Sequence, residues 1–177
     1  MQTLIDSHCH LDIAAFDADR AAVIRRAQAA GVQAFVVPGI HRRGWPGLVG
    51  CCRQHPDCHL ALGLHPVFQA EHTAADVPAL ASWIAAERPV AVGEIGLDFA
   101  LPQADRRAQQ AVFEAQLEIA AAQRLPVILH VRKAHDTVLQ ALRRHDLPGG
   151  ICHAFNGSAQ QAANYEALGF RLGFGGM

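Results

Sequence analysis

Short apolar runs alternate along the chain with longer segments in which apolar residues recur every three or four positions. The apolar runs are continuous, as in Phe35-Val36-Val37 and Val127-Ile128-Leu129. Continuous apolar runs are typical of parallel strands that helices cover, and glycines and prolines mark their ends. The pattern predicts seven strands, over residues 4–10, 34–40, 59–65, 90–97, 126–131, 150–153 and 170–175.

Six helices are predicted between these strands. Asp76 is expected to cap the helix that ends before Pro89, and Ser158 with Gln161 has the spacing of a capping box. The longest predicted helix carries a continuous apolar stripe along one side. The predicted helices lie at residues 17–30, 46–55, 76–88, 103–123, around 138–142, and between Ser158 and Gly169.

Repeated strand–helix units with short connections predict an α/β fold, either a doubly wound sheet or a (β/α)₈ barrel. No linker or low-complexity segment interrupts the pattern, so residues 1–177 are predicted to form a single domain. A count of seven strands and six helices leaves a standard barrel short of one strand and two helices.

Composition narrows the class of protein. The chain has 15 Lys and Arg against 16 Asp and Glu, which excludes a broadly basic nucleic-acid-binding surface. No apolar run of about 18 residues and no signal-peptide pattern occurs. The five cysteines show no C-x-x-C pair, and those between residues 51 and 59 fit no usual zinc spacing. We therefore expect reduced thiols, no membrane partner and a cytoplasmic location.

Histidine is the unusual residue, with 11 copies. His8 and His10 end the first predicted strand and point to the same side of it. Glu94 lies within an otherwise apolar strand, and His130 and His153 end two later strands. Barrel enzymes place their active sites at these C-terminal strand ends. Because a buried carboxylate and several imidazoles are costly without partners, these five residues are predicted to share a metal centre.

Each of these residues also has a purely structural explanation. His8 could cap its strand through a backbone hydrogen bond, and Glu94 could form a buried ion pair with Arg132. His130 and His153 could be imidazoles of the core that find partners there. The metal centre accounts for all of them together, whereas the structural explanations need a separate reason for each residue.

Five segments carry a resemblance to a known family, and they occur in the order in which that family has them. They are Asp6-Ser7-His8-Cys9-His10-Leu11-Asp12, Gly63-Leu64-His65-Pro66, Gly93-Glu94-Ile95-Gly96-Leu97-Asp98, Leu125-Pro126-Val127-Ile128-Leu129-His130 and His153-Ala154-Phe155-Asn156-Gly157. With them the chain resembles, over essentially its whole length, the TatD family of metal-dependent deoxyribonucleases, and most closely its YjjV-like bacterial branch.

The resemblance implies a TIM-type barrel with a two-metal centre that hydrolyses phosphodiester bonds of DNA with a metal-activated water. By the resemblance, His8 and His10 bind one metal ion, and His130 and His153 bind the other. Glu94 bridges the two ions and is the catalytic residue present in the chain. Imidazole and carboxylate ligands suit Zn²⁺ or Mn²⁺, and the family is described as Mg²⁺-dependent.

Other residues are candidates for supporting roles. His65 and Arg132 are predicted to contact the substrate phosphate. Asp6 faces the same side as His8 and is expected to accept a hydrogen bond next to the metal centre. Asp98 is expected to hold the loop after the fourth strand and to take no part in catalysis.

The chain departs from the family at its end. The resemblance implies an aspartate at the end of an eighth strand, which binds metal and serves as the general base, whereas this sequence ends at Met177. We therefore expect a C-terminally truncated barrel. Loss of a positioned base costs about 10²- to 10⁴-fold in rate, so the chain alone is expected to be a poor catalyst or to be completed by another copy.

Two further functions are compatible with the sequence. The first is an amidohydrolase-type C–N or ester hydrolase, a class that shares the His-x-His opening. Its lysine-bridged members are disfavoured, because the single lysine is Lys133 and Glu94 occupies the fourth strand. The second is a metal-binding remnant without turnover.

Overall fold

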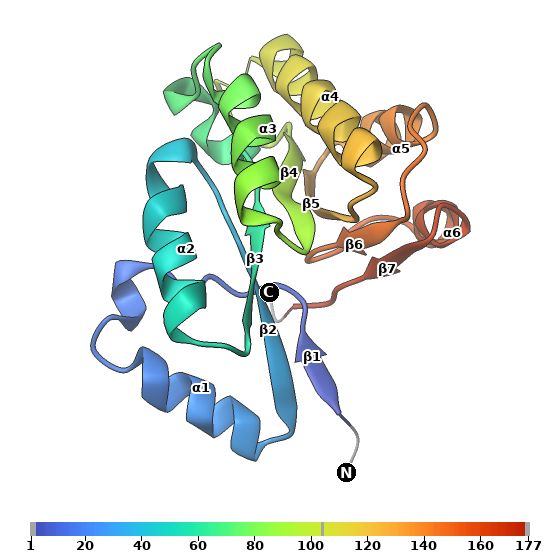
Figure 1. The fold of residues 1–177 in the computed structure, drawn as a ribbon. Helices are drawn as coiled ribbons and strands as arrows, with labels where there is room; N and C mark the ends of the chain where they lie inside the picture. Colours follow the sequence, from blue (N-terminus) through green and yellow to red (C-terminus); the bar gives the residue numbers. More distant parts are fainter. Residues whose placement is uncertain (1–2, 104, 176–177) are drawn as a thin grey trace.

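The predicted strands form one sheet of seven parallel strands that pair in chain order, β1 to β7, in a computed structural model (Figure 1). The structure describes residues 3–103 and 105–175. The sheet curls as in a TIM-type barrel, and this α/β class confirms the expected architecture. The strands are β1 (Leu4–Asp6), β2 (Val32–Pro38), β3 (Cys58–Leu62), β4 (Ala91–Asp98), β5 (Val127–Arg132), β6 (Gly150–Cys152) and β7 (Phe170–Leu172).

An α-helix follows each of the first six strands and packs on the outside of the sheet (Figure 1). Three short 3₁₀ helices, which the sequence pattern did not predict, precede α1, α2 and α3. The α-helices are α1 (Arg20–Ala29), α2 (Trp45–Gln54), α3 (Asp76–Glu87), α4 (Arg106–Gln123), α5 (His135–Leu142) and α6 (Ala159–Ala167), and the 3₁₀ helices are η1 (Ala14–Phe16), η2 (Arg42–Gly44) and η3 (Pro66–Glu71).

The main hydrophobic core lies between the helices and the sheet. Leu62 and Leu129 of the strands pack there with Phe113 and Leu117 of α4, and all four side chains are buried. A small second cluster of Ala61, Ala91 and Ile128 belongs to the other face, because successive strand residues point to opposite sides. The outer layer of helices thus holds the strands in place and leaves their C-terminal ends to form a site.

Four strands are shorter than expected, and two of them are β6, which was predicted to reach residue 153 but ends at Cys152, and β7, which was predicted to reach residue 175 but ends at Leu172. The first strand was predicted to reach residue 10, but β1 ends at Asp6, because the Asp6 carboxylate accepts the His8 backbone N–H at 3.1 Å. This local bond competes with the sheet ladder. The third strand was predicted to reach residue 65, but β3 ends at Leu62. His8, His10 and His65 therefore lie in loops just beyond the strand ends, whereas His130 lies within β5.

At the N-termini of the helices, the structure confirms one predicted cap and corrects two predicted starts. The capping box of Ser158 and Gln161 is present at the start of α6. Asp76 is not the cap of α3 but its first residue, and its carboxylate accepts the Thr73 N–H at 2.8 Å. The helix expected from residue 103 begins at Arg106, because the Asp105 carboxylate caps it through the Ala108 N–H.

Residues 1–2, 104 and 176–177 lie outside the described residues, and they include the chain end on which the expected truncation rests. None of the helices in the described part of the chain has the length and apolar character that a bilayer crossing requires.

Candidate metal centre

The centre forms around the carboxylate of Glu94 at the C-terminal edge of the sheet. All eight residues of β4 are buried, and Glu94 itself is 1% exposed. A carboxylate at this depth needs partners, since removing its charge from water costs several kcal/mol. The partners come from the loops after β1 and β3 and from β5 itself.

Each oxygen of Glu94 faces two imidazoles. Oε2 lies 2.7 Å from Nε2 of His8 and 3.4 Å from Nε2 of His10. Oε1 lies 3.3 Å from Nε2 of His65 and 3.3 Å from Nδ1 of His130. The result is two sets of possible metal ligands, His8 with His10 and His65 with His130, that share one carboxylate.

The surroundings keep Glu94 charged. Burial alone would raise the pKa of this carboxyl, but hydrogen bonds from the four imidazoles outweigh burial and hold its pKa well below the ordinary range. The carboxylate is therefore an anion whose two oxygens point to opposite groups of nitrogen atoms. Such a donor set of imidazoles and one bridging carboxylate fits Zn²⁺ or another divalent transition metal.

His130 is oriented by a second buried carboxylate, that of Asp98. Nε2 of His130 lies 3.0 Å from Oδ2 of Asp98, which is fully buried. This bond places a proton on Nε2, so Nδ1, which faces Glu94, is the nitrogen that would give up its proton to a metal ion and offer it a lone pair. Asp98 also accepts the Ala100 N–H at 3.0 Å, so it holds the loop after β4 as expected. Its contact with His130 was not predicted.

The two ring nitrogens of His65 have different partners, and these partners decide which nitrogen carries the proton. Its Nδ1 accepts the Val67 N–H at 3.1 Å, and burial lowers the pKa of the ring. A neutral imidazole whose Nδ1 accepts a hydrogen bond carries its proton on Nε2. Nε2 of His65 is then a donor to Glu94 and has no lone pair to offer a metal ion.

His153 lies beside the centre but in neither set of ligands. Its ring stacks on that of His8, with ring centres 3.5 Å apart and planes 15° from parallel. Burial and the neighbouring His8 lower the pKa of His153 to about 4, so its ring is neutral at pH 7. The structure thus brings His8, His10, Glu94 and His130 together, with His65 inside the cluster and His153 at its side.

The remaining candidates lie close by. Asp6 contacts His8 as expected, although through the backbone N–H and not through the ring. Arg132 does not form the buried ion pair with Glu94, because its guanidinium lies 3.5 Å from Asp98 and its side chain is 56% exposed. No cysteine takes part in either group of possible metal ligands in the described ranges.

Two buried glutamines of α4 hold the loops that carry the site, and the sequence analysis missed both. Gln109 accepts the Asp98 N–H at 2.9 Å and donates to the Asp98 carbonyl. Gln116 does the same for Leu64, the residue before His65, at 2.7 and 3.2 Å. The seven-residue spacing puts both on the apolar face of α4. A polar residue on such a face is the signal that could have identified them.

Replacing Gln116 by leucine should lower the free energy of unfolding by about 2–4 kcal/mol, because the buried N–H and C=O of Leu64 lose their partners. Urea unfolding would measure this change. Gln123→Leu, at an exposed position of the same helix, is the control and should stay within about 0.5 kcal/mol of the parent. Equal effects of the two substitutions would contradict the role of the carboxamide.

Comparison with known proteins finds a matching family and similar sequences. A family model described as TatD related DNase matches residues 5–177. The chain is 39% identical over 176 residues to the uncharacterized metal-dependent hydrolase YjjV of Escherichia coli K12, covering 97% of this chain and 68% of that protein. It is 37% identical over 165 residues to the 3'-5' ssDNA/RNA exonuclease TatD of Rahnella sp. Y9602, covering 91% and 62%.

Solved structures match in the same way. The crystal structure of the TatD homologue YJJV from Escherichia coli K12 has a TM-score of 0.91 at 37% identity, covering 96% of this chain and 66% of that one. A TatD family hydrolase from Entamoeba histolytica shares the fold, with a TM-score of 0.84 at 18% identity, covering 98% and 65%. The chain spans about two thirds of the length of these relatives.

Proposed function

Because the chain belongs to the family of TatD-related DNases, we propose that it is a metal-dependent hydrolase that cleaves phosphodiester bonds of single-stranded nucleic acid. The observation that carries the proposal is the buried carboxylate of Glu94 with two imidazoles at each oxygen. An arrangement of this kind suits two cations that share one bridging ligand. The names of the relatives supply the substrate class.

The proposed ligands follow from which nitrogen atoms carry lone pairs. His8 and His10 would hold one divalent ion, Zn²⁺, Mn²⁺ or Mg²⁺, at Oε2 of Glu94. His130, through Nδ1, and His153 would hold the other. Both are favoured over His65, because the Asp98 contact frees Nδ1 of His130 and the low pKa of His153 leaves its ring neutral.

The chain's own groups would bind and orient the substrate. When bound, the cations would supply Lewis acidity to the phosphate and to an attacking water. With Glu94 engaged by the cations, the Nε2–H of His65 would donate to a non-bridging phosphate oxygen instead of to Glu94, and the half-exposed guanidinium of Arg132 would add a second donor. Asp98 would hold both His130 and Arg132 in place.

Substitutions at His153 and His65 should separate a ligand from a substrate contact. We expect His153→Asn to lower the metal content by one ion per chain after dialysis. His65→Asn should keep the metal content and raise KM about tenfold, because it removes a donor to the substrate. Elemental analysis and steady-state kinetics measure the two effects. The opposite pattern, with metal lost only in His65→Asn, would exchange the two roles.

Metal affinity should rise with pH between about 6 and 8. Burial alone would lower the pKa of His10 and of His130, but the Glu94 carboxylate outweighs burial and raises both above the ordinary value. A raised pKa means that each ring keeps its proton at a higher pH, and this proton competes with the metal ion. Affinity should therefore fall as pH falls, by up to about tenfold per pH unit for each proton displaced.

Calorimetric titration of the metal-free chain in buffers of different ionisation enthalpy would count these protons. More protons should be released at pH 6.5 than at pH 8. An affinity that does not change over this range would argue against His10 and His130 as ligands.

The proposed activity is tested on the metal-stripped chain reloaded with Mg²⁺, Mn²⁺ or Zn²⁺. A p-nitrophenyl phosphodiester and a 5'-labelled single-stranded DNA should be hydrolysed, whereas amide and lactone substrates should not. Hydrolysis of amides or lactones alone would favour the amidohydrolase-type reaction. Bound metal without hydrolysis of any substrate would identify the chain as a binding protein without turnover.

We also propose a cytoplasmic location, supported by five free cysteines in the described residues. Free thiols are usual in a reducing compartment. Burial raises the pKa of Cys9, Cys58 and Cys152, which makes these thiols unreactive.

A further inference from the structure

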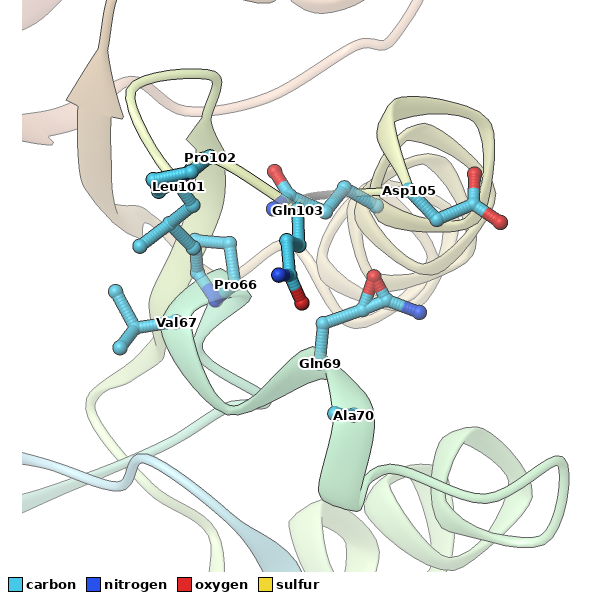
Figure 2. Close-up of a pocket in the computed structure, with 9 residues that line it drawn as sticks. Pro66, Val67, Gln69, Ala70, Leu101, Pro102, Gln103 and Asp105 are labelled. Atoms are coloured by element: carbon cyan, nitrogen blue, oxygen red, sulfur yellow. The ribbon is translucent and has the colours of Figure 1, made fainter.

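A cavity of about 460 Å³, which we name the η3 pocket, is linked to the candidate metal centre through its wall residue Val67, whose N–H donates to Nδ1 of His65. Its walls come from η3, from the loop after β4 and from the start of α4 (Figure 2). Two of these segments start beside the centre. The helix η3 directly follows His65, and the loop after β4 directly follows Asp98, which contacts His130. The cavity is within the size range of small-molecule sites.

The walls are mainly apolar. Figure 2 shows Pro66, Val67, Leu101 and Pro102 grouped on one side of the pocket. Val67 is 43% exposed, so this apolar surface is open to a ligand. A flat apolar group could pack against these side chains.

The polar groups of the pocket are carboxamides. The side chains of Gln69 and Gln103 lie opposite the apolar side (Figure 2). Oε1 of Gln69 is covered and has no hydrogen-bond partner among the described groups, a state that costs about 1–3 kcal/mol. Rotation of this side chain would turn the oxygen toward the cavity, where a donor on a ligand could reach it.

The pocket does not suit a phosphate. Among the described residues that line it none is cationic, and its charged side chain, Asp105, caps α4 through the Ala108 N–H. The carboxamide of Gln109 is already bound to the backbone of Asp98. A neutral group that is flat, with donors and acceptors on its edge, matches the remaining surface.

A nucleobase has these properties. Carboxamides of glutamine pair with base edges, and packing of a base on apolar or aromatic side chains is worth about 1–3 kcal/mol. We propose that the η3 pocket binds the base of a nucleotide next to the phosphate that is cleaved. This inference rests on the proposed phosphodiesterase function, and it adds a subsite that would anchor the substrate strand.

The first test fills the pocket. Ala70, an exposed residue of its wall, would be replaced by phenylalanine, and Ala86→Phe at an exposed position of α3 is the matched control. The substrates are a thymidine decamer and decamers with a tetrahydrofuran abasic nucleotide at the 3' end or next to it. In the parent chain, removal of one base should lower kcat/KM about tenfold. In Ala70→Phe the intact decamer should react as slowly as the abasic one, and Ala86→Phe should behave like the parent.

The second test measures binding without hydrolysis. Thymidine, which has no phosphate, would be added to chain labelled with ¹³C in its methyl groups, and the resonances of Val67 and Leu101 should shift. The shifts should disappear in Ala70→Phe and persist in Ala86→Phe.

The two tests separate failure of the pocket from failure of the proposed function. If kcat/KM is the same for the intact and abasic decamers and the resonances of Val67 and Leu101 do not shift, the nucleobase pocket is overturned but the proposed function is not. Shifts that Ala70→Phe abolishes, in a chain that cleaves no diester with any metal, would support a nucleobase pocket and overturn the phosphodiesterase.

Discussion

Replacement of Glu94 by glutamine should reduce the bound metal from the proposed two ions per chain to one or none and lower hydrolysis by at least about 100-fold. Each oxygen of Glu94 faces two imidazole nitrogens, at 2.7–3.4 Å. Glutamine has the same shape but no charge, and its NH₂ group can only donate. One side of the centre would therefore lose its acceptor, and both would lose the bridging anion.

Elemental analysis after dialysis and a nuclease assay with each metal would measure the two losses. Glu118→Gln, at an exposed position of α4, removes the same charge and should leave both quantities unchanged. A circular dichroism melt of the metal-free chains would show whether each variant is folded. A folded Glu94→Gln chain that still binds two ions would disprove the bridging role.

Replacement of Gly96 by alanine should lower the free energy of unfolding by about 3 kcal/mol or more, or prevent recovery of folded protein. Gly96 has φ +142°, and a Cβ at this position would lie 2.0 Å from the carbonyl oxygen of His130. Gly96 pairs with His130 between β4 and β5, both of which are in the core. Backbone atoms would have to move, and the displacement would reach the centre through His130.

Gly47→Ala is the matched control, because a Cβ at this position of α2 meets no atom within 4 Å. Alanine is favoured over glycine within a helix by about 0.5–1 kcal/mol, so this variant should be at least as stable as the parent. Denaturant unfolding of both variants gives the comparison. A Gly96→Ala chain within 1 kcal/mol of the parent would show that the two strands can separate locally at little cost.

The elements of the fold were largely predictable because their signals are local. A run such as Val127-Ile128-Leu129 predicts a buried strand, and it lies in β5. The Ser158 capping box correctly predicted the start of α6. The errors arose where a side chain competes with the backbone, as Asp6 does at the end of β1 and Asp105 at the start of α4.

The candidate site was predictable in position but not in detail. Histidines at the C-terminal ends of parallel strands lie at one edge of the sheet, so His10 and His130 were expected near Glu94. The sequence pattern contained no signal for the contact between Asp98 and His130. The position of His65 against Glu94 depends on the path of the loop after β3, which a hydrogen-bonded ring nitrogen helps to hold.

The sequence by itself determined the order and type of the elements, the parallel sheet and the edge at which the site forms, because apolar periodicity acts between residues close together in the chain. Only the tertiary structure decided which nitrogen of each imidazole faces Glu94 and which loops α4 holds through Gln109 and Gln116. Those features depend on hydrogen bonds between residues as far apart as His8 and Glu94, and such bonds exist only once the sheet has curled and the helices have packed on it.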